Sequence, residues 1–206
     1  MKERVIYRRS FESGENHVAL RQGEILTGVI QYKPVVEELL QQTQELSFKP
    51  ILHPYAIVTT QDCDLDWDYT ARNSQEVESL KLLNSIILCE ITTAQEIKDT
   101  RDINGKQVMD SKTWNLVKSH RHERYYFFEK VSSECEVEKE GLPELTADFK
   151  KVFGMDAATL YRQIEIGMVK RRTTLISPYS EHFSRRYHSF HDRVALPFQY
   201  ESEKGC

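Results

Sequence analysis

The sequence contains no long run of apolar residues and no close pair of cysteines. Its four cysteines stand at positions 63, 89, 135 and 206, so we expect reduced thiols rather than disulfides. No stretch approaches the roughly 18 apolar residues that a membrane-spanning helix needs. The first residues, MKERVIYRRSFESGEN, are charged where a signal peptide is apolar. We therefore expect a cytoplasmic protein that does not enter a membrane.

Internal repeats and low-complexity tracts are also absent from the 206 residues. That length suits one substantial core, or a core with a small helical appendage, and is short for two ordinary domains. An apolar content of 39%, with 10% aromatic residues, is enough for a packed interior. We predict a β-rich core with inserted helices at 1–155, a basic helical region packed on it at 156–198, and a flexible tail at 199–206.

Charge is divided unevenly along the chain, although the formal net charge is only −4. Residues 62–102 contain ten acidic and four basic side chains, whereas residues 157–197 contain seven basic and three acidic ones. A basic terminal region fits a nucleic-acid backbone, and a solvated surface is the alternative interpretation.

Residues 53–69, HPYAIVTTQDCDLDWDY, carry the densest polar chemistry. The first half is short, β-branched and apolar, which predicts a buried strand. Four aspartates then recur at every second residue, so an extended chain would place the acids on one face and the apolar groups on the other. We predict that Thr60, Asp62 and Asp64 form a catalytic rim where this strand ends.

The acidic stretch also suggests metal binding. An EF-hand calcium loop fails, because Trp67 and Asn73 stand where glycine and glutamate are required. Oxygen ligands at the exit of a strand suit Mg²⁺, and we predict Asp64 with Glu90 as its ligands. The alternative is an acidic turn that caps helices and pairs with the basic region. A zinc site would have to combine His53, Cys63, Cys89, His120 and His122. The spacings of these residues match no compact zinc module.

The rest of the chain predicts an α+β fold. We expect a small, mainly antiparallel barrel or sheet of the SH3-like kind, with inserted helices and a C-terminal helical pair packed across it. Runs of β-branched or aromatic residues predict strands near Ile25, Ile57, Ile87 and Tyr126. Apolar spacing and capping residues predict helices at 34–48, 74–83, 110–119 and 156–170, and a last one that opens at Ser177 and Pro178.

Basic residues gather in the last third of the chain. Histidines at 182, 188 and 191 can serve as acid or base near neutral pH, as ribonucleases that use no metal require. Earlier in the chain, Arg121 and Arg124 could contact phosphates, while Tyr125 and Tyr126 could stack on bases. The residues that we predict to bind nucleic acid are Arg171, Arg172, Arg185, Arg186 and Arg193.

The order of the N-terminal parts resembles MazF/PemK-type toxins. Gly23-Glu-Ile-Leu, a long excursion and then Tyr55-Ala-Ile-Val-Thr-Thr60 are similar to the opening of that family over residues 20–65. The resemblance implies an SH3-like β-barrel and RNA cleavage by an arginine near the first hairpin and a serine or threonine after the hydrophobic strand. Thr60 or Thr59 would carry the second role. Over more of the chain, TQDCDLDWDY, RYYFF and RRTTLISPYSEHFSRRYHSFHDRVALP resemble bacterial proteins of mobile or defence loci.

Two functions follow as predictions. The first is a nucleic-acid-acting component of a bacterial toxin or antiphage-defence system, which would be ribonuclease-like and has Mg²⁺ as its candidate cofactor. The second is a non-enzymatic subunit of a multi-protein defence complex, which binds a protein from the same locus. Exposure separates them, because the first requires Arg185, Arg186 and the aspartates beside a cleft, whereas the second tolerates them paired to each other.

Overall fold

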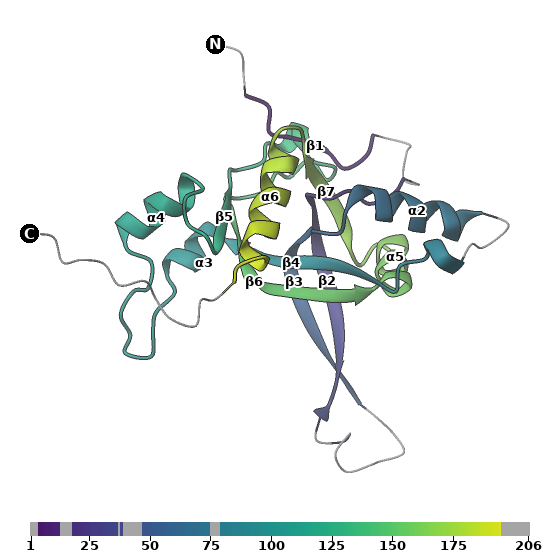
Figure 1. The fold of residues 1–206 in the computed structure, drawn as a ribbon, viewed down its shortest axis with the longest axis horizontal. Coiled ribbons are helices and arrows are strands. Elements are labelled where there is room, and N and C mark those ends of the chain that lie inside the picture. The colour runs from purple at the N-terminus through teal and green to yellow at the C-terminus, as the bar shows by residue number, and fades with distance from the viewer. Residues whose placement is uncertain (1–3, 13–17, 37, 39–46, 75–78, 195–206) are drawn as a thin grey trace, which may run out of the picture.

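The described residues form a seven-stranded antiparallel sheet in the order β1-β7-β2-β3-β4-β6-β5 (Figure 1). The computed structural model describes residues 4–12, 18–36, 38, 47–74 and 79–194. The predicted α+β class is confirmed, as are the strands expected near Ile25, Ile57, Ile87 and Tyr126. The strands are β1 (Tyr7–Arg9), β2 (Glu24–Pro34), β3 (Phe48–Val58), β4 (Ser85–Thr93), β5 (Tyr125–Phe128), β6 (Leu145–Asp156) and β7 (Lys170–Leu175).

Four of the described α-helices lie in connections between strands, and the fifth follows the strand β7. They are α2 (Asp62–Asn73), α3 (Ala94–Lys98), α4 (Ser111–Lys118), α5 (Ala157–Glu165) and α6 (Tyr179–His191), with 3-10 turns at Ser79–Lys81 and Ser133–Cys135. Side chains cap several of them: Asp110 and Asp156 each accept a hydrogen bond from the amide three residues on, at 2.7 Å, and Thr93 forms a reciprocal capping box with Glu96. In the described part of the chain, none of the helices has the length and apolar character needed to cross a membrane.

The sheet is open but strongly curled. β1 and β5 are its edge strands and share no ladder, yet the Tyr7 hydroxyl of β1 donates to the carbonyl of Glu129, directly after β5, at 2.9 Å. Arg4 forms an ion pair with the same Glu129. A closed barrel, one of the two predicted forms, is therefore not present. The two edges are joined by side chains instead of backbone pairing.

Apolar side chains from the two faces of the sheet pack into separate clusters. Ile57 of β3 lies in the first cluster and its neighbour Val58 in the second, as alternation along a strand requires. The first cluster is covered by α6, whose Phe183 and Phe190 contact Phe149 of β6. The second lies under α2 and α5, and a third joins α3 and α4 to β5. Each cluster fixes one group of helices on the sheet.

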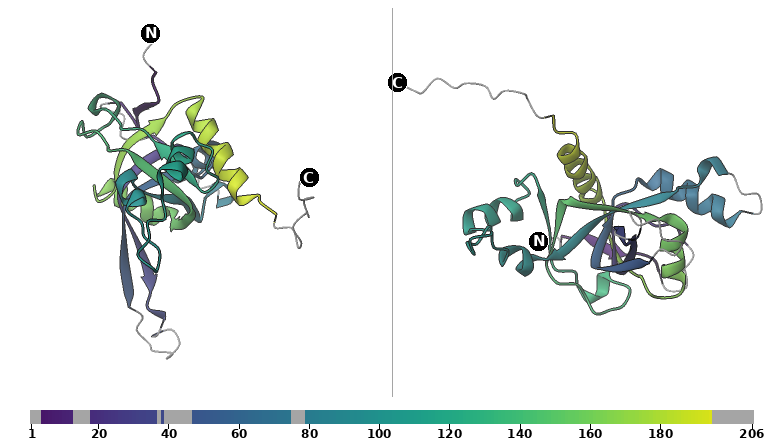
Figure 2. Two further views of the ribbon diagram at one scale, coloured as in Figure 1. Left: turned by 90° about the vertical axis from the view of Figure 1, so that its left-hand side faces the viewer. Right: turned by 90° about the horizontal axis from the view of Figure 1, so that it is seen from below.

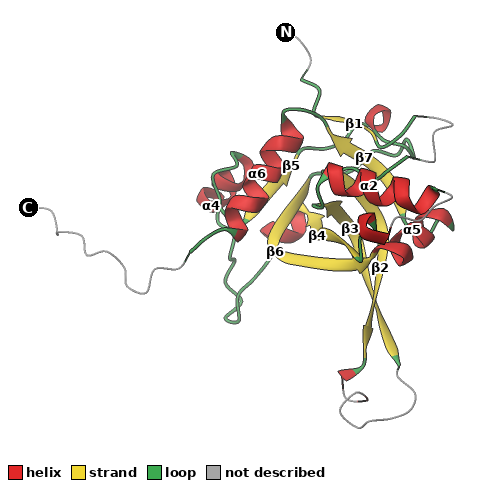
Figure 3. Ribbon diagram, turned by 45° about the vertical axis from the view of Figure 1, so that its right-hand side comes forward, coloured by secondary structure: helices red, strands yellow, loops and turns green. Residues whose placement is uncertain are grey.

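A long ribbon of β2 and β3 projects from the body of the molecule (Figures 1 and 3). The two strands pair as far as Pro34 and Phe48, but β7 pairs with β2 only up to Thr27 and β4 pairs with β3 only from Tyr55. Beyond those points the ribbon has no neighbouring strand among the described residues. The helix predicted at 34–48 lies mostly outside the described residues.

The acidic stretch is helical, which contradicts the extended conformation predicted for it. Asp62 and Asp64 lie in the first turn of α2, where the helix dipole favours negative charge. Leu65, Asp68 and Ala71 recur every three residues and are the buried positions of this helix. The alternating acids therefore point to different sides of a helix and do not line one face of a strand.

The predicted C-terminal helical pair is interrupted by a strand. α5 and α6 both form, but β7 runs between them in sequence and pairs with β1 and β2 inside the sheet. The two helices pack in different clusters and lie apart in each view (Figures 1 and 2). Residues 156–194 therefore build part of the sheet as well as covering it. The tail at 199–206 lies outside the described residues.

Candidate functional site

The three residues predicted to be catalytic lie where β3 passes into α2. The Thr60 hydroxyl accepts a hydrogen bond from the amide of Ile87 at 2.8 Å, which ties the end of β3 to β4. Asp62 accepts one from the amide of Gln22 at 2.7 Å. Asp64 is half-buried on the first turn of α2. The contacts of Thr60 and Asp62 hold this corner of the chain in place.

The later acids of α2 have partners of their own. Asp66 forms an ion pair with Arg21 at 2.7 Å. Asp68 is buried. Nε of Arg72 donates one bifurcated hydrogen bond to the two carboxylate oxygens of Asp68, at 2.9 and 3.0 Å, and the amide of Leu83 donates another at 2.7 Å. A buried carboxylate needs such compensation. Asp68 therefore holds the segment that follows α2 against the helix.

Glu90, the second predicted magnesium ligand, lies on β4 between two basic side chains. Its carboxylate contacts Nδ1 of His53 at 2.9 Å and Nζ of Lys151 at 2.8 Å. Burial opposes ionisation, but the hydrogen bonds from Lys151 and His53 outweigh it and lower the pKa of Glu90. This carboxylate is already neutralised by its neighbours.

A metal site is not supported by the geometry. Within the described residues, no group of three or more His, Cys, Asp or Glu side chains could hold a metal ion. The predicted magnesium ligands are on different elements, Asp64 on α2 and Glu90 on β4. Cys89 is buried in the core, and burial raises the pKa of its thiol. The zinc set is likewise not assembled from His53, Cys63, Cys89, His120 and His122.

Arg171 and Arg172 lie on β7 instead of a helix, and both are buried in ion pairs. Arg171 contacts the two oxygens of Glu24 at 2.6 and 3.0 Å and also donates to two backbone carbonyls. Arg172 contacts Glu136 and Glu140; neighbouring residues of a strand point to opposite faces. Because these charges are neutralised inside the protein, neither guanidinium is available to a phosphate.

The other three predicted arginines lie on α6 or just after it, and two of them contact the loop that precedes β5. Arg186 donates to the carbonyl of His122 at 2.5 Å, across 64 positions of sequence. Arg193 forms an ion pair with Glu123 at 3.3 Å. Arg185 is exposed and has no ion-pair partner within the described residues. The fold thus places α6 against residues 119–124, SHRHER.

Two histidines and a tyrosine meet at this junction, and we name them the His–Tyr cluster (His120, Tyr126 and His182). The Tyr126 hydroxyl and Nδ1 of His182 are 3.0 Å apart. The ring centroid of His120 lies 4.3 Å from that of Tyr126 and 5.2 Å from that of His182. His120 has a left-handed backbone with φ 56°, which is uncommon for residues other than glycine.

Burial and neighbouring cations perturb the pKa values of the His–Tyr cluster. Burial, His182 and Arg186 together lower the pKa of His120 to about 4. Burial, followed by Arg186 and Arg185, lowers the pKa of His182, and burial raises the pKa of Tyr126. Both imidazoles are therefore neutral at pH 7 and the phenol keeps its proton. A neutral ring nitrogen is able to accept a proton from a substrate.

The junction also contains buried polar atoms that are not hydrogen-bonded. His120 Nδ1 and Arg186 Nε have no partner within the described residues. Unsatisfied polar atoms, left-handed backbone and perturbed pKa values are each uncommon, and they concentrate at functional sites. We therefore take the His–Tyr cluster and the arginines of α6 as the candidate site.

The chain matches no family model, no curated protein and no solved structure. The assignment of the site thus rests on its geometry. From the sequence, His182 is predicted as an acid or base and Tyr126 as a stacking residue, whereas His120 appears only in the zinc set. No local pattern connects them, because 56 positions separate Tyr126 from His182.

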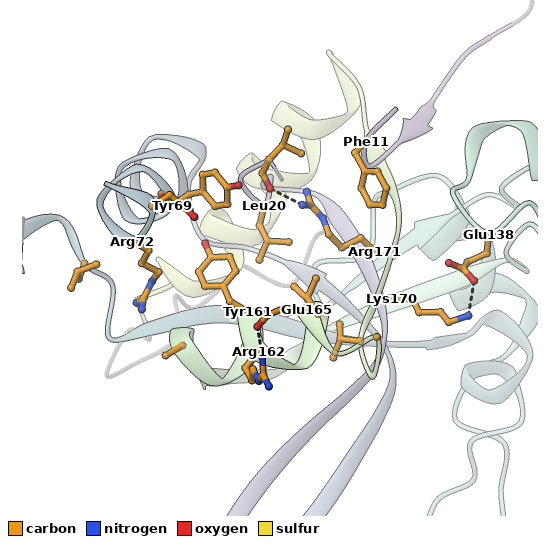
Figure 4. A pocket seen from close by; sticks show the side chains of 17 residues that line it. Phe11, Leu20, Tyr69, Arg72, Glu138, Tyr161, Arg162, Glu165, Lys170 and Arg171 are labelled. Carbon is orange, nitrogen blue, oxygen red and sulfur yellow. Dashed lines mark hydrogen bonds and ion pairs between the residues drawn. The ribbon is translucent and has the colours of Figure 1, made fainter. Parts of the chain in front are cut away.

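A cavity of about 970 Å³ lies elsewhere, between α2, α5 and the start of β7 (Figure 4). Tyr69 and Tyr161 meet there edge to face, with ring centroids 6.4 Å apart. The cavity offers apolar contact and ring stacking more than free charge, because each cation on its lining has a carboxylate partner. These pairs are Arg72 with Asp68, Arg162 with Glu165, Lys170 with Glu138 and Arg171 with Glu24.

Proposed function

We propose that the protein binds RNA and cleaves it by general acid–base chemistry at the His–Tyr cluster. The observation that carries this proposal is the meeting of two neutral imidazoles and a phenol beside the arginines of α6. Exposed Arg185 supplies positive charge for a phosphate. RNA is favoured over DNA because its 2′-hydroxyl provides an internal nucleophile next to each phosphate.

The contacts suggest a role for each side chain. With its proton on Nδ1, His182 donates to Tyr126, which orients the ring and leaves Nε2 to accept the proton of the 2′-hydroxyl. The O2′–P bond then forms and the P–O5′ bond breaks. The protonated ring returns its proton to the leaving 5′ oxygen, and its lowered pKa makes it a ready donor.

The remaining groups of the site support this step. Arg185 stabilises the negative charge that develops on the phosphate oxygens. His120 stays neutral and packs against the rings of Tyr126 and His182, so it is a positioning residue. Tyr126 acts in the same way through its hydrogen bond to His182.

Incubation of the purified protein with an RNA and with a DNA of the same sequence, with and without magnesium, tests the proposal. We expect RNA products that end in a 2′,3′-cyclic phosphate and intact DNA. His182→Asn should reduce the rate by roughly 10²-fold or more. His191→Asn, at the exposed end of the same helix, should leave it unchanged. Absence of both binding at low salt and cleavage would reject the proposal.

The setting that we propose is a bacterial toxin or antiphage-defence component of the MazF/PemK type, working in the cytoplasm and bound by a protein from the same locus. The resemblance of residues 20–65 motivates this part. A relation to SH3-like barrels is supported by the curl of the sheet, since Tyr7 at one edge reaches Glu129 beside the other.

The second candidate function is a non-enzymatic subunit of a multi-protein complex. It is favoured by the exposed apolar side chains of the projecting ribbon, among them Phe48 and Leu52. RNA cleavage that depends on His182 would exclude a purely structural role. Stable assembly without any effect on RNA would support it.

A further inference from the structure

One face of the ribbon formed by β2 and β3 is apolar. The register of the two strands places Ile30 opposite Leu52, Tyr32 opposite Pro50 and Pro34 opposite Phe48. Alternate residues of a strand share a face, and residues opposite each other on paired strands point to the same side. We name these six residues the ribbon face.

The large side chains of the ribbon face are exposed to solvent. Leu52 is 59% exposed, Phe48 57% and Tyr32 51%. Tyr32 also lines a shallow hollow together with Ile166 and Met168, which are exposed themselves, and with Arg162, whose charge is paired with Glu165. The apolar surface therefore continues from the ribbon onto the turn between α5 and β7. Contiguous apolar surface of this kind marks an interaction site on a soluble protein.

The opposite side of the ribbon carries the charge. Lys33 and Lys49 stand directly opposite each other, an arrangement that is unfavourable unless both groups are hydrated. Gln31 on the same side donates to the carbonyl of Gly154 at 3.1 Å and so faces the body of the protein. The ribbon is thus amphipathic, with an uncharged side and a lysine side.

We propose that the ribbon face is covered by the ribbon face of a second copy of this chain. The ribbon face has no charged group that could form an ion pair with a charged partner. The ribbon face of a second copy has the same length and the same apolar character. A two-fold axis between the copies would stack the ribbons as two small sheets. Lys33 and Lys49 of both copies would then remain in water.

The available area is sufficient for such a dimer. A large apolar side chain that is half exposed presents roughly 100 Å², so the ribbon face with Ile166 and Met168 offers about 500 Å² per copy. Two copies would bury about 1,000 Å² together, which is the lower limit for a specific interface. We therefore expect a dimer that dissociates on dilution.

Sedimentation velocity of the full chain over roughly a hundred-fold range of concentration tests this proposal. We expect a dimer at the upper end and a monomer at the lower end. Phe48→Ser combined with Leu52→Ser should give a monomer throughout. Lys33→Ser combined with Lys49→Ser, on the other side of the same ribbon, should keep the dimer. The thermal transition of each variant shows whether it is folded.

Hydrogen exchange at two concentrations gives a second readout, because the amides of 48, 49 and 51–53, which lie in the β2–β3 ladder, should exchange more slowly in the dimer than in the monomer. A monomer at every concentration would overturn the proposal, and so would a dimer that survives the Phe48 and Leu52 changes. Protection of the ribbon by a different protein, without self-association, would assign the face to that protein instead. The ribbon variants do not alter the His–Tyr cluster, so RNA cleavage is tested independently.

Discussion

The four aspartates of α2 look alike in the sequence but have different environments in the fold. Asp62 and Asp64 are in the first turn, and Asp66 pairs with Arg21 at the surface. Asp68 is fully buried between Arg72 and the amide of Leu83. A spacing of two residues suggested one shared role for these acids. A helix separates them, because its period is 3.6 residues.

Asp68→Asn should lower the free energy of unfolding by about 3 kcal/mol, because it leaves the cation of Arg72 without its partner. Asp64→Asn is the matched control in the same helix, and we expect a change within about 0.5 kcal/mol. Urea unfolding of both variants measures the difference. Similar losses of unfolding free energy in the two variants would show that the burial of Asp68 does not account for its contribution to stability.

The lowered pKa of His120 predicts a dependence of stability on pH. The pKa falls from an ordinary value of 6.5 to about 4 in the folded protein, so the unfolded chain binds a proton more readily between these values. The part of the unfolding free energy that depends on neutral His120 is therefore fully present above pH 6.5 and is lost as the pH falls toward 4. Urea unfolding of wild type and His120→Asn should show a shallower pH dependence in the variant. Identical slopes would contradict the assignment.

Elements differ in how far the sequence predicts them. The strands expected near Ile25, Ile57, Ile87 and Tyr126 are present, because each contains an apolar or aromatic run. However, β2 extends to Pro34 and β3 begins at Phe48, which are the two ends of the segment that was predicted to be a helix. The strand β7, with the sequence KRRTTL, was not predicted, because two adjacent arginines are typical of a solvent-exposed segment. They are buried only because Glu24 and Glu136, both distant in sequence, neutralise them.

The candidate site was also predicted from the sequence only in part. Arg185 and His182 lie on a helix that was predicted, and both were selected from the sequence. The contacts that give His182 its environment come from Tyr126 and His120 on another part of the chain. The topology of the sheet brings these three side chains together, so a local sequence pattern cannot predict their contacts.

Gly28 should not tolerate a side chain, because β2 passes directly under the turn between α5 and β7. Its φ is 78°, and an added Cβ would lie 2.7 Å from the backbone carbonyl oxygen of Met168. Gly28→Ala should cost more than about 2 kcal/mol, since strain and steric overlap add. Gly105→Ala is the control: its φ is 76°, but nothing lies within 4 Å. We expect about 1 kcal/mol there. Thermal unfolding of both variants measures the two losses of stability. Equal losses would show that backbone strain alone accounts for them and that the contact with Met168 adds nothing.

At the scale of the whole molecule, the edges of the sheet are joined through Tyr7. Tyr7→Phe removes the hydrogen bond to the Glu129 carbonyl and should cost about 1 kcal/mol. Hydrogen exchange should also accelerate at β1, because β7 is the one strand that pairs with it among the described residues. Tyr32→Phe removes a hydroxyl from the exposed ribbon and should change neither quantity. Unchanged exchange at β1 in Tyr7→Phe would show that the edges hold without this bond.

The pairing of β1 with β7 also affects how the chain can fold during its synthesis. Tyr7 is paired with Leu175, so the first strand has to wait until most of the chain has left the ribosome. α6, which covers the first core cluster, is made later still. A nascent chain therefore carries an uncovered apolar sheet surface until α6 emerges. Chaperones that shield such surfaces should raise the yield of folded protein.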